Sequence, residues 1–145
     1  MIISRTPIRI TFLGGGTDYP DYFLRAGGET FGMAIDKYSY VVVNPLSRLS
    51  RLSSHRFDIS YQKKEQVDNI DAIEHPSVRE CLRHTKIKSG LDIHYTGDLP
   101  ARTGLGSSSS FTVGLLNALY AYQGRQVANG VLAQESYFPV RAWGA

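Results

Sequence analysis

The sequence has little of several features that mark particular classes of protein. It contains one cysteine, Cys81, so a disulfide framework within the chain is excluded and a reducing compartment, the cytoplasm, is expected. No apolar run approaches the length that a membrane span requires, and the first residues lack the apolar core of a signal peptide. The net charge of +3 is compatible with phosphate ligands but too small to indicate a nucleic acid partner.

The composition is that of an ordinary globular domain. The chain has 145 residues, of which 42% are hydrophobic and 20% are charged. A chain of this length usually forms one domain around its own core. The sequence contains neither an internal repeat nor a low-complexity segment, so we expect a single folded unit.

Hydrophobic periodicity predicts a mixed α+β layout. Alternating β-formers predict strands over residues 2–12, 29–46, 57–61 and 91–96. Helical spacing predicts a short turn at 21–25 and helices over 76–89, 108–122 and 126–135. The charged segment 63–74 is expected at the surface. Gly90 is expected to end the second of these helical segments, and Pro139 to break any helix that reaches it.

Residues 100–110 are the most informative stretch, with the sequence Pro-Ala-Arg-Thr-Gly-Leu-Gly-Ser-Ser-Ser-Ser. Glycines can adopt a positive φ and let a ligand approach the backbone. A helix that begins in the serines would direct several free N–H groups, and the positive end of its dipole, into this turn. Such a site favours an anion, most often phosphate. We therefore expect the chain to bind a nucleoside triphosphate.

Three established motifs do not fit this serine turn. A P-loop requires a lysine after its second glycine, and none follows Gly106. A nucleophile elbow requires a closing glycine, which residues 106–110 lack. A dinucleotide-binding fingerprint requires a third glycine where Ser109 stands. A serine-capped helix after a tight turn, without any ligand, remains as an alternative.

A second glycine-rich stretch accompanies the serine turn. Residues 7–19 read Pro-Ile-Arg-Ile-Thr-Phe-Leu-Gly-Gly-Gly-Thr-Asp-Tyr. This stretch resembles the first motif of the GHMP kinases, and residues 100–109 resemble their second motif, in the same order along the chain. The resemblance extends over residues 4–135. It implies an α+β fold similar to domain 2 of ribosomal protein S5, the N-terminal domain of these kinases, in truncated form.

In this superfamily the second motif wraps the phosphates of ATP. The resemblance implies ATP contacts from one set of residues: Pro100, Gly104, Leu105, Gly106, Ser107, Ser108 and Ser109. It also makes the hydroxyl of Ser108 a ligand of Mg²⁺, for which a helix N-cap is the structural alternative. A catalytic role follows for Arg9, whose guanidinium would stabilise charge at the transferred phosphoryl group. The alternative for Arg9 is an ordinary outward-facing strand residue.

The first motif is implied to bind a sugar or sugar phosphate through Gly14, Gly15, Gly16, Thr17 and Asp18. Asp18 would accept hydrogen bonds from sugar hydroxyls, although a turn also explains an aspartate there. Galactokinases carry Glu-His in place of Gly15 and Gly16, which favours a bulkier or phosphorylated sugar over galactose. The Gly-Gly-Gly-Thr-Asp form most resembles the branch with D-glycero-D-manno-heptose 7-phosphate kinase. The implied reaction is ATP-dependent phosphorylation of a sugar hydroxyl.

The chain departs from the family pattern near its end. Family members are more than twice as long, and their catalytic aspartate, acidic Mg²⁺ ligand and C-terminal domain come later. Glu135 is the last acidic residue and aligns with neither role. We expect residues 1–135 to be a partial N-terminal domain and residues 136–145 an atypical tail. An uncovered apolar face would cause self-association, and kinase activity would be weak or lost. A non-catalytic binding module or an RNA-associated domain are the alternative functions.

Overall fold

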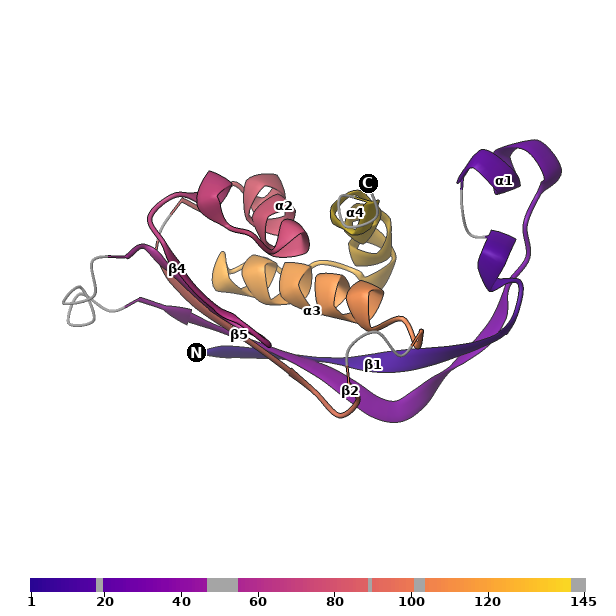
Figure 1. The fold of residues 1–145 in the computed structure, drawn as a ribbon, viewed down its shortest axis with the longest axis horizontal. Helices are drawn as coiled ribbons and strands as arrows, with labels where there is room; N and C mark the ends of the chain where they lie inside the picture. Colours follow the sequence, from indigo (N-terminus) through magenta and orange to yellow (C-terminus); the bar gives the residue numbers. More distant parts are fainter. Residues whose placement is uncertain (18–19, 47–54, 89, 101–103, 142–145) are drawn as a thin grey trace.

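The computed structural model describes residues 1–17, 20–46, 55–88, 90–100 and 104–141. A single sheet carries helices on one face, and an arm projects from one end of the sheet (Figure 1). This mixed α+β architecture confirms the fold class expected from the sequence. Among the described residues, no helix is both long enough and apolar enough to cross a membrane.

The sheet has five strands in the order β1-β2-β5-β3-β4. Their bounds are β1 Ile2–Leu13, β2 Phe31–Pro45, β3 Phe57–Ser60, β4 Lys64–Val67 and β5 Leu91–Gly97. Neighbouring strands are antiparallel except β3 and β5, which are parallel. Alternate residues of the central strands, such as Val41, Val43 and Ile93, are fully buried under the helices, as the period of two predicts.

Three helices form the second layer. They are α2 Pro76–Thr85, α3 Ser107–Tyr122 and α4 Asn129–Arg141. Helix α3 packs directly on β1 and β2, while α2 and α4 pack against α3. Leu115, Leu116 and Leu119 of α3 are fully buried. The best helical pattern in the sequence therefore forms the centre of the core.

An arm extends beyond this core. Residues 31–38 of β2 pair with β1 alone, because β5 pairs with β2 only from Ser39 onward. The tip of the arm carries a short 3₁₀ turn, η1 (Gly15–Thr17), and helix α1 (Pro20–Ala26), away from the other helices (Figure 1). The arm exposes a set of large apolar side chains: Phe12, Leu13, Tyr22, Phe23, Leu24, Phe31 and Met33.

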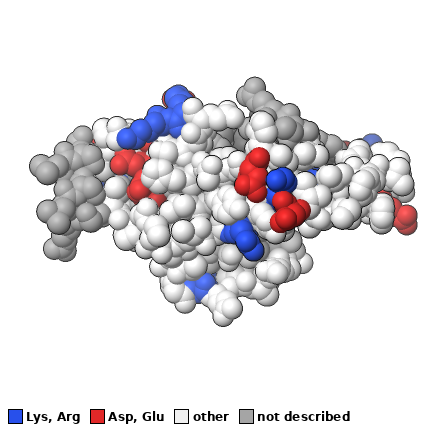
Figure 2. Space-filling view, turned by 90° about the horizontal axis from the view of Figure 1, so that it is seen from below, with Lys and Arg blue, Asp and Glu red and all other residues white. Residues whose placement is uncertain are grey.

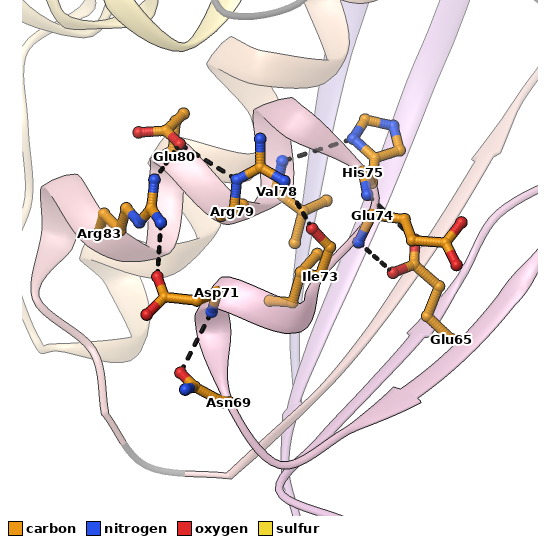
Figure 3. A network of polar contacts seen from close by, with 10 residues as sticks. All are labelled: Glu65, Asn69, Asp71, Ile73, Glu74, His75, Val78, Arg79, Glu80 and Arg83. Carbon is orange, nitrogen blue, oxygen red and sulfur yellow. Dashed lines mark hydrogen bonds and ion pairs between the residues drawn. The ribbon is translucent and has the colours of Figure 1, made fainter.

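Helix α2 begins at a buried polar network, drawn in Figure 3. The carboxylate of Glu65 accepts hydrogen bonds from the backbone N–H groups of Glu74, at 2.6 Å, and His75, at 3.2 Å. The hydroxyl of Tyr61 donates to the same carboxylate at 2.7 Å. His75 is the N-cap of α2, and its Nδ1 accepts from the N–H of Val78 at 3.4 Å. Together these bonds satisfy donors that a helix start leaves unpaired.

The same network braces the start of α3. The ring of His75 lies 4.9 Å from the ring of Tyr61 and 5.1 Å from that of Phe111. Phe111, in the first turns of α3, also contacts the ring of Tyr95 on β5 at 4.9 Å. These aromatic contacts hold the serine end of α3 against the sheet.

Three local expectations are wrong, the first of them in part. Segment 63–74 is mostly exposed, as expected, but it also contains a strand, β4, and a 3₁₀ turn, η3 (Ile70–Ala72), and it buries Glu65 and Ile73. Hydrophobic periodicity cannot detect the burial of a charged residue such as Glu65. Helix α2 ends before Gly90, at Thr85, because Lys86 adopts the left-handed conformation with φ of 56°. Helix α4 continues through Pro139 to Arg141; proline in the last turn removes only one helical hydrogen bond.

Candidate functional site

The two glycine-rich motifs meet where α3 begins. The side chain of Arg9 on β1 lies against Gly106: a Cβ added to Gly106 would lie 3.1 Å from Cγ and 3.4 Å from Cζ of Arg9. About one helical turn further along, the hydroxyl of Ser110 donates to the carbonyl oxygen of Pro7 at 3.0 Å. The packing of helix α3 on strand β1 therefore brings together two segments that are far apart in the sequence.

Helix α3 starts without a side-chain cap. Its N-cap is Gly106, with φ of 72°, rather than a serine. The N–H of Ser110 donates to the carbonyl oxygen of Gly106 at 3.0 Å. The N–H groups of residues 107–109 have no hydrogen-bond partner among the described residues. These half-buried serines leave three amides and their hydroxyls available at the positive end of the helix dipole.

Arg9 adds a second positive group at this point. Its Nη1 donates a hydrogen bond to the hydroxyl of Thr11, which is neutral. In the part of the chain that the structure describes, no carboxylate lies within ion-pair distance of Arg9. The guanidinium charge is therefore left uncompensated beside the uncapped helix end.

The first glycine turn is shaped by its contact with the start of β2. Gly14 has φ of 80°, and a Cβ at this position would lie 1.8 Å from the carbonyl oxygen of Glu29, so only glycine fits. Thr17 closes the turn: its N–H and its hydroxyl donate to the carbonyl oxygen of Gly14 at 2.9 and 2.8 Å. The hydroxyl of Thr17 also donates to Glu29 O at 3.2 Å.

A cavity of about 340 Å³ lies in the arm beside this turn. It is lined by Thr17, Phe23, Gly28 and Thr30. Of the predicted sugar-binding residues, Thr17 lines the cavity; Gly15 and Gly16 lie in η1 next to it, and Asp18 lies outside the described residues. Sequence reasoning missed the other three lining residues. The paired glycines 27 and 28 were the signal in the sequence that could have indicated this part of the cavity. The structure explains the second glycine, because a Cβ on Gly28 would lie 2.8 Å from the carbonyl oxygen of Thr17.

The remaining predicted residues precede α3, whereas Glu135, to which no role was assigned, lies at the opposite end of this helix. Pro100 is exposed and Leu105 half-buried, at the start of the serine turn; residues 101–103 lie outside the described part of the chain. Glu135 lies at the far end of α3, where it accepts a hydrogen bond from Tyr120 Oη at 2.5 Å. Tyr120 is roughly 18 Å from Ser108 along the helix axis. Glu135 therefore does not share a metal ion with Ser108.

The described residues offer little for a metal ion besides serine hydroxyls. They contain no group of three or more His, Cys, Asp or Glu side chains that could hold one. Mg²⁺ commonly takes one or two protein ligands and completes its shell with phosphate oxygens and water. A single hydroxyl such as that of Ser108 fits this pattern when a polyphosphate supplies the other ligands.

Part of the chain matches a family model, and most of it aligns with a curated relative. Residues 72–137 match the GHMP kinases N terminal domain. A galactokinase from Pyrococcus furiosus is 29% identical over 125 residues, which cover 81% of this chain and 33% of that protein. The chain thus spans about a third of the length of this curated relative.

Solved structures share the fold over nearly the whole chain. A D-glycero-D-manno-heptose 1-phosphate kinase from Bacteroides thetaiotaomicron superposes with a TM-score of 0.77 at 22% identity, covering 96% of this chain and 47% of that one. The Methanococcus jannaschii mevalonate kinase gives a TM-score of 0.72 at 19% identity, covering 97% and 46%. These likenesses establish the architecture of the chain.

Proposed function

The chain has the fold of the GHMP kinase N-terminal domain, and from this premise we propose that it is the nucleotide-binding part of an ATP-dependent sugar kinase. The observation that carries the proposal is the position of Arg9 against Gly106, at the uncapped start of α3. Two positive groups are brought together there without a described counter-charge. Such an arrangement is unfavourable by itself and becomes favourable when an anion binds.

ATP is the anion proposed for this site. Backbone amides of residues 104–109, which include Leu105, would bind its phosphates, and Pro100 would add a contact from the start of the turn. The hydroxyl of Ser108 would be a Mg²⁺ ligand, and the metal would reduce the negative charge on the phosphates. Arg9 would stabilise the charge that develops on the transferred phosphoryl group. Because phosphoryl transfer depends on position and electrostatics, a fixed guanidinium at the helix start suits this reaction.

The proposed phosphoryl acceptor is a sugar or sugar phosphate, with a heptose 7-phosphate as the specific candidate. The first glycine turn, with Thr17 on the cavity in the arm, would hold its hydroxyls, together with Asp18. Support comes from the galactokinase relative and from the fold shared with a heptose 1-phosphate kinase. Gly15 and Gly16 carry no side chains, which leaves room for a larger sugar than galactose.

The division of the chain belongs to the same proposal. Residues 1–135 would be the partial N-terminal domain and residues 136–145 an atypical tail, although α4 crosses this boundary and ends at Arg141. The catalytic base and the acidic Mg²⁺ ligand would come from outside these residues. The chain would then bind ATP while transferring phosphate weakly or not at all, and its uncovered apolar surface would promote self-association.

An RNA-associated function has less support. That function needs basic side chains interleaved with aromatic ones on an open sheet face. Figure 2 shows the face turned away from the helices, where red and blue side chains are scattered among uncharged ones. On this face Asp92 of β5 pairs with His94 at 2.8 Å and lies beside Asp58 of β3. Negative charge in the middle of the sheet disfavours a polyanion.

Calorimetry with ATP, in the presence and absence of Mg²⁺, tests the proposal. We expect Arg9→Ala to weaken binding about tenfold or more, because one charge-assisted contact is lost. Ser108→Ala should remove the part of the affinity that depends on Mg²⁺. Arg5→Ala is the matched control: Arg5 lies on the same strand but over the Tyr38 ring, at 4.4 Å. Wild-type protein that fails to bind ATP, or an equal loss in both arginine variants, would overturn the proposal.

A phosphoryl-transfer assay separates the kinase from a non-catalytic binding module. Heptose 7-phosphate and galactose would be offered as acceptors, with formation of ADP as the measured product. Any transfer that depends on Arg9 supports the kinase. ATP binding without transfer, even after a C-terminal kinase domain is added in trans, would favour the binding module.

A further inference from the structure

We propose that Thr11 is a positioning residue that holds the guanidinium of Arg9 in place without neutralising it; this inference rests on the proposed ATP site. Thr11 lies two residues after Arg9 on the same side of β1, and its hydroxyl accepts the hydrogen bond from Arg9 Nη1. The Cγ, Nε and Cζ atoms of Arg9 lie 3.1 to 3.4 Å from the position of a Cβ built on Gly106. Arg9 is therefore held between the hydroxyl of Thr11 and the start of α3.

Thr11 also lies beside the first glycine turn. Its methyl carbon Cγ2 lies 3.5 Å from the position of a Cβ built on Gly15. One side chain thus binds the arginine at the proposed phosphate site and lies beside the turn proposed to hold the sugar. A displacement of Thr11 would change the geometry of both the proposed phosphate site and the proposed sugar site. These two sites must hold their ligands in register for a transfer reaction.

The backbone around Thr11 is closely packed. Thr11 faces Gly32 of β2, and a Cβ on Gly32 would lie 2.5 Å from the carbonyl oxygen of Ile10 and 3.2 Å from the Cα of Thr11. The pairing of β1 with β2 shifts register on both sides of Thr11, between Pro7 and Arg9 and between Thr11 and Leu13. These irregularities re-aim side chains, as bulges often do beside functional sites. The close strand contact limits movement of the backbone at Thr11.

A hydroxyl suits this position better than a carboxylate. Aspartate at position 11 would bind the guanidinium more strongly, but it would also cancel the charge that attracts the phosphate. Threonine accepts one hydrogen bond and leaves the full positive charge of Arg9 available to an anion. Valine has the same shape but no acceptor, and serine keeps the acceptor but loses the methyl group that lies beside Gly15.

Three substitutions at Thr11 test this role, with ATP and Mg²⁺ as the probe. Thr11→Val should raise the Kd for ATP about three- to tenfold, because Arg9 is no longer held. Thr11→Asp should also raise it, because Arg9 is held but neutralised. Thr11→Ser should keep the affinity close to that of the wild type. A purely structural role for Thr11 predicts instead that affinity follows the thermal stability of the three variants.

Side-chain NMR of Arg9 provides a readout that does not depend on ATP. The hydrogen-bonded guanidinium protons should exchange slowly in the wild type, Thr11→Ser and Thr11→Asp, and rapidly in Thr11→Val. Unchanged affinity and unchanged proton exchange in Thr11→Val would overturn the inference. Wild-type protein that shows the slow exchange but does not bind ATP would overturn the proposed function and leave the Thr11–Arg9 contact established.

Discussion

Replacement of Gly106 by alanine separates the effect of backbone strain from the effect of contact with Arg9. Gly106 has φ of 72°, a conformation that disfavours any residue with a Cβ by about 1–2 kcal/mol. The added methyl would also lie 3.1 to 3.4 Å from the Cγ, Nε and Cζ atoms of Arg9. Because the arginine side chain is flexible, it can move away at little conformational expense, but its guanidinium then leaves the helix start.

Gly124 provides the matched control for the backbone term. It lies just beyond the opposite end of α3 and has φ of 73°, with no atom within 4 Å of an added Cβ. Both alanine variants should lose about 1 kcal/mol, since the lower entropy of the unfolded chain offsets part of the strain. For a chain of this size that loss lowers Tm by roughly 3 °C. Gly106→Ala should additionally weaken ATP binding about tenfold, because it displaces a charge-assisted contact.

Differential scanning fluorimetry and calorimetry on the two variants complete the test. The reasoning predicts similar losses of Tm and unequal losses of ATP affinity. If Gly124→Ala weakens ATP binding as much as Gly106→Ala, the effect comes from general destabilisation. If neither variant changes the affinity, the contact between Arg9 and Gly106 has no part in nucleotide binding.

Two further predictions concern stability and association. Burial lowers the pKa of His75 below its ordinary value of 6.5. The contribution of neutral His75 to the free energy of unfolding is therefore complete above pH 6.5 and decreases as the pH falls below it. Urea unfolding at pH 7 and pH 5 should show a smaller loss of stability for His75→Asn than for the wild type, because asparagine retains an N-cap acceptor but does not titrate. Leu24 and Phe31 expose 76% and 65% of their surface on the arm and should drive self-association. The double variant Leu24→Lys with Phe31→Thr should therefore sediment as a monomer, whereas the control Val131→Lys on α4 should not. A wild type that is monomeric at micromolar concentration contradicts the expectation.

Local sequence patterns predicted much of the scaffold. Strands β1, β2, β3 and β5 and helices α2 and α3 occur where periodicity placed them, because each buries one face and exposes the other. The 63–74 segment shows the limit of this signal. Glu65 is buried there because three donors from Tyr61 and from the start of α2 converge on its carboxylate, and these donors are unrelated to Glu65 by any local period.

The ends of α2 and α4 could not be predicted from the sequence, because they depend on small conformational energies at single residues. Lys86 adopts a left-handed conformation that lysine normally avoids, and it ends α2 four residues before the glycine that would do so at no steric cost. Pro139 lies within α4 although it lacks the N–H that the helix requires. In each case a cost of about 1–3 kcal/mol is outweighed by the surrounding structure.

The sequence by itself predicted the kind of site that we propose for this chain. Two glycines followed by serines at a helix start specify free amides and a positive dipole, whatever the rest of the fold does, because these properties belong to the backbone. Only the tertiary structure showed that the side chain of Arg9 lies against this helix start. That contact depends on the packing of α3 across β1 and on Gly106, which caps the helix in place of a serine and has no side chain to exclude the arginine. Contacts between segments far apart in the chain follow from the whole packed core, which no local pattern contains.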